Sequence, residues 1–315
     1  MKFPHLQGRE KLLEPLGFTG QEARWVTLVC LHSGLFTRDQ VEAFFGLGKS
    51  AANRLILRLL QVRLSGRTLA AEEITDGRRI CHIFGKPIYR ELGITNIRHR
   101  RQSSIEVTRR RLLSLDFVLD HPDLPWLPTE QEKVACFEQL GIDPELLPKR
   151  IYYGRANGRV RYFHIKMPLA VGQDRAVFTY IDPGMGTRSE LDSWGAAHRP
   201  LWEKLRESGR RVEVVAVAWE QRLLDRAERV LASWRGRAIS DAEQEAVLLR
   251  QAIADTDWET LERHGGWDAA VKKVLQTEQE AGSLDDRGMI DDFRLWGSRR
   301  CRQTNAPPKK PRWRV

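Results

Sequence analysis

Residues 37–60, TRDQVEAFFGLGKSAANRLILRLL, decide the fold of the N-terminal part of this chain. Thr37 and Gln40 have the Thr-x-x-Gln spacing of a capping box, which marks the start of a helix. Val41, Phe44 and Phe45 give this helix one apolar face, and the Gly-Leu-Gly of residues 46–48 ends it. The stretch therefore predicts a short helix followed by a tight turn.

A second helix is predicted to begin at Ser50. Its apolar residues recur every three or four positions, as on the buried face of a helix: Ala52, Leu55, Ile56, Leu59 and Leu60. The opposite face carries Ala51, Asn53, Arg54 and Arg58, with Lys49 at the turn. Two helices in this arrangement, with Asn and Arg facing outward on the second, are typical of a helix-turn-helix that reads the major groove of DNA.

The flanking sequence extends this motif to a winged helix over residues 1–95. Upstream, Thr19 and Glu22 predict another capping box and a helix that runs to about His32. Downstream, residues 68–74 and 79–84 are strand-like and are joined through Asp-Gly at 76–77, a hairpin signal. Three helices followed by a β-hairpin describe a winged helix-turn-helix.

Each predicted DNA contact has a chemical reason. Asn and Arg side chains hydrogen-bond base edges, which makes Asn53, Arg54 and Arg58 the candidates for groove contacts. Lys49 and Ser50 lie at a helix N-terminus, where phosphate binds favourably. The remaining candidates are basic residues near the wing tip and in the segment that follows it: Arg78, Arg79, Arg100 and Arg101.

The net charge of +10 is unevenly distributed along the 315 residues. Residues 1–111 contain 20 Lys and Arg against 10 Asp and Glu, whereas residues 112–297 contain 25 against 32. Residues 298–315 contain seven basic residues and no acidic one. Basic ends around an acidic middle suit a protein that meets a polyanion through its ends. The acidic middle is a candidate for binding a protein partner or a second copy of the chain.

Beyond the winged helix, residues 96–149 are predicted to form a helical connector with a helix over 103–120. The arginines at 109–111 either extend the contact with the DNA backbone or form a solvated helix face. Residues 150–236 are predicted to form a small α/β domain with a mixed sheet, which begins with a hairpin turning at Asn157-Gly158. Residues 237–297 are predicted to be helical, with Trp258 and Trp267 in their core, and residues 298–315 to be a basic disordered tail.

The α/β domain contains acidic residues that a metal-dependent nuclease could use, which makes such an enzyme the alternative function. The candidates are Asp174, Asp182, Glu190 and Asp192. No Lys follows any of them at the acid-x-Lys spacing, so the catalytic lysine would have to be Lys166 from another element. A second set, Asp182, Glu190 and His198, could supply an acid and a base. Asp182-Pro183-Gly184 is equally well explained as a turn that ends a strand, and we expect no catalytic residue, metal or cofactor.

Four scattered cysteines predict neither a zinc site nor a disulfide framework. No apolar segment follows Met1-Lys2, and no stretch approaches the length of a membrane span. These features predict a cytoplasmic, nucleoid-associated protein without a membrane contact.

The arrangement resembles the replication-relaxation family of plasmids and integrative elements. The resemblance is carried by the helix-turn-helix run FTRDQVEAFFGLGKSAANRLILRLL, by HIFGKPIYRELG after the wing, and by AVFTYIDPG followed by a helix with Leu191 and Trp194. It implies a winged helix joined to a degenerate nuclease-like domain, and DNA binding in the replication, relaxation or mobilisation of such an element. A protein-docking winged helix without a DNA role is the second alternative.

Overall fold

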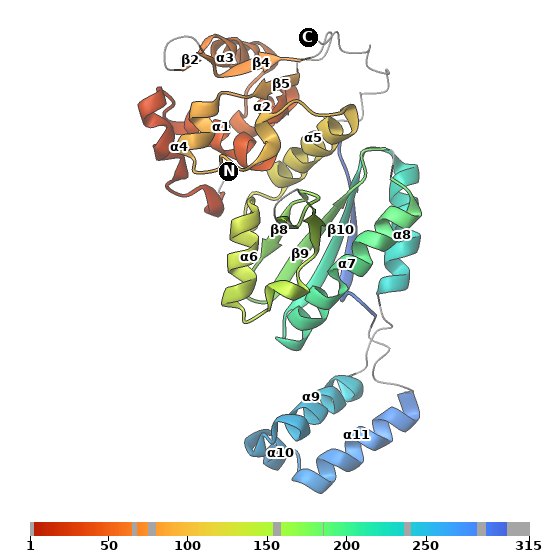
Figure 1. Cartoon of the computed structure of the whole chain (residues 1–315). Coiled ribbons are helices and arrows are strands. Elements are labelled where there is room, and N and C mark those ends of the chain that lie inside the picture. The colour runs from red at the N-terminus through yellow and green to blue at the C-terminus, as the bar shows by residue number, and fades with distance from the viewer. Residues whose placement is uncertain are drawn as a thin grey trace.

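The computed structural model describes residues 3–64, 68–74, 80–153, 159–184, 186–235, 241–281 and 288–300. It confirms the mixed fold class, with helices and strands in both halves of the chain (Figure 1). Among the described helices, none is long and apolar enough to span a membrane.

The N-terminal part contains three principal α-helices and a three-stranded antiparallel sheet. The helices are α1 (Gly20–His32), α2 (Arg38–Phe45) and α3 (Lys49–Gln61). The strands are β1 (Leu35–Thr37), β4 (Ala71–Glu73) and β5 (Ile80–Ile83), in the order β1-β5-β4. The smaller elements are η1 (Pro4–Leu6), η2 (Arg9–Leu16), β2 (Arg63–Leu64), β3 (Thr68–Leu69), α4 (Lys86–Glu91) and η3 (Arg98–Arg100). The predicted turn at 76–77 lies outside the described residues.

One of the two predicted N-terminal capping boxes forms, and the other does not. Thr37 and Gln40 cap α2 reciprocally, as predicted. Thr19 is the N-cap of α1, but its side chain makes no capping hydrogen bond, and Glu22 is ion-paired with Arg58 of α3 instead. A charged hydrogen bond to a guanidinium is stronger than one to a neutral backbone amide, which explains why Glu22 turns toward α3.

Helix α5 (Ile105–Asp120) joins the N-terminal part to the central sheet. It contacts α1, α2 and β1 on one side and β9 (Arg175–Ile181) and β10 (Arg211–Ala218) on the other. One hydrophobic core therefore runs from the N-terminal helices through α5 to one face of the sheet. The first part of the connector predicted for residues 96–149, up to Trp126, belongs to this shared core, whereas Phe137, Ile142 and Leu147 belong to a second core. Figure 1 shows α5 between the two halves.

The central sheet has the order β11-β10-β9-β8, in which β11 is Asp292–Gly297 and β8 is Leu169–Val171. Strand β8 is antiparallel to β9, and the other strands are parallel. The mixed sheet was therefore predicted correctly. Alternate residues of β9 and β10 face two different cores. Val177, Ile181, Val215 and Val217 belong to the core shared with α5, while Ala176, Phe178, Val212 and Val214 belong to the core of α7 (Arg188–Glu207) and α8 (Gln221–Trp234). Burial on both faces is why these strands read as continuous apolar runs.

A separate two-stranded ribbon precedes the sheet. It consists of β6 (Lys149–Tyr152) and β7 (Arg159–Tyr162), which pair antiparallel. Helix α6 (Glu130–Gln139) and the short helix η4 (Pro144–Leu146) lie before it. The pairing agrees with the predicted hairpin, although its predicted turn at 157–158 lies outside the described residues.

The C-terminal segment differs in two ways from the helical unit predicted for residues 237–297. Helices α9 (Asp241–Asp255), α10 (Trp258–Arg263) and α11 (Trp267–Ala281) form a unit with its own small core, but Trp258 is 57% exposed and Trp267 37% exposed. The two indoles contact each other at 5.8 Å between ring centroids instead of filling that core.

The second difference is that β11 (Asp292–Gly297) is a strand parallel to β10. The start of β11 is fixed by Asp291. The Asp291 carboxylate accepts a hydrogen bond from the Val212 amide at 2.7 Å and is ion-paired with Arg206.

Candidate nucleic-acid interface

Helix α3 presents a polar, basic stripe to solvent. Lys49, Ser50, Arg54 and Arg58 are exposed, and Asn53 is half-buried between them. Their spacing places them on one side of the helix, opposite the buried Ala52, Ile56 and Leu59. The separation of the two faces follows the sequence prediction, except that Leu57 is 47% exposed within the polar stripe. A leucine at this place can contact the methyl group of thymine.

The turn before α3 is set by two glycines. Gly46 caps α2 with a left-handed backbone at φ 64°, and Gly48 is the N-cap of α3. The helix therefore begins at Lys49, one residue before the predicted start. Lys49 and Ser50 lie in its first turn, where free backbone amides and the helix dipole favour an anion.

Helix α2, on which α3 packs, is anchored by the fully buried side chain of Gln40. Its Oε1 accepts the Thr37 amide at 2.9 Å and completes the capping box. Its Nε2 donates to the Leu112 carbonyl at 2.9 Å and to Asp116 Oδ1 at 2.7 Å, both on α5. One amide group thus both starts α2 and fixes it to α5, a second role that the capping-box spacing alone does not reveal.

Asp116 extends this anchor to the last strand of the sheet. Ser298, directly after β11, donates its hydroxyl to Asp116 Oδ2 at 2.5 Å, and Arg300 Nη1 lies 3.7 Å from Oδ1. Asp116 and Ser298 are both fully buried. The carboxylate therefore links three segments that are far apart in sequence: α2, α5 and the end of β11.

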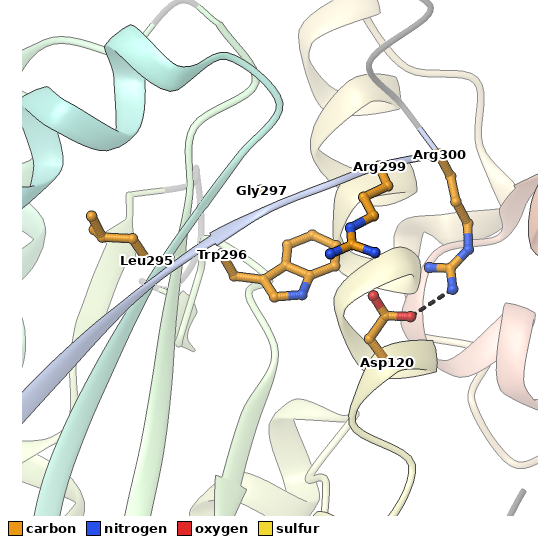
Figure 2. Close-up of a pocket in the computed structure, with 6 residues that line it drawn as sticks. All are labelled: Asp120, Leu295, Trp296, Gly297, Arg299 and Arg300. Carbon is orange, nitrogen blue, oxygen red and sulfur yellow. Dashed lines mark hydrogen bonds and ion pairs between the residues drawn. The ribbon is translucent and has the colours of Figure 1, made fainter.

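A hollow lies beside this link, at the carboxyl end of β11 (Figure 2). The residues that line it are Asp120, Leu295, Trp296, Gly297, Arg299 and Arg300. Arg300 Nη2 donates to Asp120 Oδ1 at 2.5 Å, so two carboxylates of α5 compensate its charge. Arg299 is exposed and forms no ion pair within the described part of the chain. At this hollow, the segment directly after β11 is fixed to α5.

Arg58 has a structural partner as well as an exposed position. Its guanidinium is ion-paired with the buried Glu22 of α1, although 63% of the Arg58 side chain is exposed. Burial raises the pKa of the Glu22 carboxyl, and the charge of Arg58 lowers it again. Arg54 forms no ion pair or hydrogen bond within the described part, so its guanidinium is the better probe of DNA contact.

We predict that Arg58→Ala lowers the free energy of unfolding by about 1 kcal/mol at pH 7, the scale of a half-exposed pair. Removing Arg58 raises the folded-state pKa of Glu22 further above its unfolded value, so folding favours the protonated form. The loss of stability should therefore shrink as the pH falls toward 4 and Glu22 takes up its proton. Urea unfolding of both proteins at pH 7 and pH 4 measures this, and a difference independent of pH would contradict it.

The other predicted DNA contacts lie outside α3. Arg78 and Arg79 fall outside the described residues. Arg100 and Arg101 follow a segment that packs against β5, where the His82 ring nitrogen Nε2 donates to the His99 carbonyl at 2.9 Å. Arg101 is exposed and Arg100 is half-buried.

The arginines at 109–111 do not form a freely solvated helix face, because all three are half-buried and contact other groups of the protein. Arg111 donates to the backbone carbonyls of Arg98, His99 and Arg101 at 3.0–3.4 Å, and burial lowers its pKa to about 10. Arg110 is ion-paired with Glu106 at 2.6 Å, and Arg109 lies 5.0 Å over the Trp219 ring. All three side chains therefore make contacts within the protein while they remain partly exposed.

The acidic residues considered for a nuclease do not converge. Asp182 Oδ1 accepts the amides of Gly184 and Gly186 at 2.8 and 3.0 Å, and Oδ2 pairs with Arg226 at 3.1 Å. This is a strand-ending turn, one of the two explanations that the sequence allows. Among the described residues, no group of three or more His, Cys, Asp and Glu side chains is placed to hold a metal ion.

The remaining residues considered for a nuclease site do not join Asp182. Glu190 caps α7 with Thr187, and Asp192 is paired with Arg188. Asp174 precedes β9, at the end of the strand opposite to Asp182. Lys166 has a pKa lowered to about 8 by burial and by nearby arginines.

His198 is buried within the core of α7 and α8. Its Nδ1 donates to the Trp194 carbonyl at 2.7 Å, and the rings of Phe163, Phe178 and Trp202 surround it. Burial lowers its pKa to about 3. The set of Asp182, Glu190 and His198 is therefore not assembled into one site.

Comparison with known proteins found no matching family model, no matching curated protein and no matching solved structure.

Proposed function

We propose that this protein binds double-stranded DNA through α3 and serves as an accessory or regulatory protein of a mobile genetic element. The observation that carries the proposal is the exposed stripe of Lys49, Ser50, Asn53, Arg54 and Arg58 on a helix whose other face is buried. A protein core does not require this stripe, and its chemistry complements phosphates and base edges.

The order of the N-terminal elements supports this proposal. A helix, a short strand, two helices and an antiparallel hairpin follow one another, and the short strand joins the hairpin in one sheet. A winged helix-turn-helix has this order, and its second motif helix enters the major groove. The anchoring of α2 by Gln40 also limits the movement of α3, which favours sequence-specific binding because little order has to be gained on association.

The residues of α3 have distinct proposed roles. Arg54 and Asn53 contact base edges, Lys49 and Ser50 bind a phosphate at the helix N-terminus, and Arg58 contacts the backbone while it is held by Glu22. The wing arginines, the pair Arg100 and Arg101, and the basic residues after 298 would add sequence-independent affinity.

The biological setting is proposed from the resemblance to the replication-relaxation family. In that setting the protein acts in the cytoplasm, on the nucleoid or on the element's DNA, in replication, mobilisation or transcription control. The acidic residues between 112 and 297 would serve self-association or a protein partner. No observation favours the nuclease alternative over this proposal.

We predict that Arg54→Ala lowers the affinity for a duplex selected from a random library by about 1–3 kcal/mol. The substitution removes a bidentate contact to a base, so the affinity for random DNA should change much less. Fluorescence anisotropy with the full chain measures both affinities. The matched control is Arg229→Ala, which removes an exposed arginine from α8. Arg229 donates only to a backbone carbonyl of its own helix. Two results together would count against the proposal: the selection enriches no sequence, and wild type and Arg54→Ala bind DNA equally.

A further inference from the structure

The ribbon of β6 and β7 is a basic segment within the acidic middle of the chain. Residues 149–162 contain five Lys and Arg and no Asp or Glu. The strands pair in the register Arg150 with Arg161 and Tyr152 with Arg159. Directly paired residues of an antiparallel ribbon share a face, so this face carries three arginines and a tyrosine.

The inner end of the ribbon is fixed to the rest of the protein. Arg161 is ion-paired with Glu130 of α6 at 3.0 Å, and the same carboxylate accepts the Tyr162 amide at 2.9 Å. Lys149 is paired with Glu145. These contacts neutralise the two basic residues nearest the body of the protein and hold the ribbon in place.

Two arginines of this face are left uncompensated. Within the described residues, Arg159 at the outer end and Arg150, directly opposite Arg161, are exposed and have no carboxylate partner. Like charges near each other on one face of a ribbon are destabilising unless an anion lies between them. The guanidinium of Arg150 lies 5.3 Å over the Tyr152 ring, which holds it beside an aromatic surface.

The aromatic rings at this end are unusually accessible. Tyr152, on the arginine face, is 41% exposed, and Tyr153, directly after β6, is 88% exposed. Ile151 (45% exposed) and Val160 (40%) pair with each other on the opposite face. Exposed aromatic side chains interleaved with unpaired arginines are what single-stranded nucleic acid binds, because bases stack on the rings and phosphates pair with the guanidinium groups. A duplex offers its phosphates to such a surface, but its base faces are already stacked.

We propose that the arginine face and the outer end of the β6–β7 ribbon bind single-stranded DNA, with Tyr152 and Tyr153 stacking on bases and with Arg150 and Arg159 pairing with phosphates. This site is separate from α3 and does not depend on duplex binding there. A protein with both sites would hold a duplex through α3 and an unpaired strand through the ribbon.

The test measures binding of the full chain to a fluorescent single-stranded oligonucleotide and to the duplex of the same sequence. Tyr153→Ala is expected to weaken single-strand binding about 5- to 150-fold, the range that corresponds to one stacked base. Tyr153→Phe keeps the ring and should bind like the wild type. Arg54→Ala should leave single-strand binding unchanged, so failure at one site can be told from failure at the other.

Photocrosslinking to an oligonucleotide that contains 5-iodouracil locates the contact directly. Crosslinks mapped by mass spectrometry to Tyr152 or Tyr153 would support the proposal. Equal single-strand affinity of Tyr153→Ala and wild type, with crosslinks only in residues 301–315, would overturn it. Loss of duplex binding alone in Tyr153→Ala would also overturn it in favour of a groove contact.

Discussion

Asp116→Ala is expected to lower the free energy of unfolding by roughly 2–4 kcal/mol, the largest effect we predict for a single polar side chain. Its carboxylate accepts hydrogen bonds from Gln40 Nε2 and from the hydroxyl of Ser298, and all three residues are fully buried. Each buried donor that is deprived of its acceptor costs about 1–3 kcal/mol, and Gln40 keeps only the Leu112 carbonyl. Urea unfolding followed by tryptophan fluorescence measures the decrease in stability.

Asp120→Ala is the matched control, because Asp120 lies one turn later on α5 and also pairs with Arg300. Its side chain is 37% exposed, so we expect a decrease below about 1 kcal/mol. Asp116→Asn should recover part of the stability, since an amide oxygen can still accept one of the two hydrogen bonds. Equal stability of Asp116→Ala and Asp120→Ala would show that Asp116 does not link α2 to the end of β11.

Acidification from pH 6.5 to pH 5 is expected to cost about 1.6 kcal/mol through His198 alone. Its folded-state pKa is about 3, far below its ordinary value of 6.5, because the ring is buried among aromatic side chains. Between these two values the unfolded chain binds a proton that the folded chain cannot, so stability is present above pH 6.5 and is lost as the pH falls. His5, with a pKa lowered to about 3 by burial and by Arg9, acts in the same direction.

His198→Phe removes this titration and should flatten the dependence of unfolding free energy on pH by about one bound proton. If His198→Phe and wild type lose stability in parallel between pH 6.5 and 5, His198 is not held neutral by its surroundings.

The predictable parts of this fold are those whose signal is local. The capping box at Thr37, the glycine end of α2 and the apolar runs of β9 and β10 all correspond to observed elements. The periodicity of α3 also predicted its buried and exposed faces. In each case the information lies within a few residues of the element.

The unpredicted parts depend on contacts between distant segments. Strand β11 has only six residues, and it is a strand because β10, far earlier in the chain, offers it an unpaired edge. Glu22 is spaced for a capping box but meets Arg58 from another helix. The arginines at 109–111 looked like a solvated helix face because nothing nearby in the sequence shows that α5 is covered on two sides.

The candidate site divides in the same way. Its residue types and their helix face follow from the sequence, whereas the anchoring of α2 through Asp116 to Ser298 does not, because those two residues are 182 positions apart. The exposed tyrosines of the β6–β7 ribbon were also missed, because a hairpin that contains both Tyr and Arg is equally compatible with a half-buried sheet. The absence of any acidic residue from 149 to 162 was the signal that could have pointed to them.

The central claim is that α3 is the duplex-binding element, and a salt titration of binding tests it most directly. Anisotropy of a labelled duplex is measured with the full-length wild type, Lys49→Gln/Arg54→Gln and Arg229→Ala between about 50 and 300 mM salt, where phosphate neutralisation dominates the salt dependence. We predict that log affinity falls linearly with log salt in the wild type and in Arg229→Ala. The double variant should bind more weakly, with a slope that is shallower by about 0.9 for each phosphate that the protein no longer neutralises. Identical affinities and slopes for all three proteins would place the DNA-binding surface elsewhere and contradict the account.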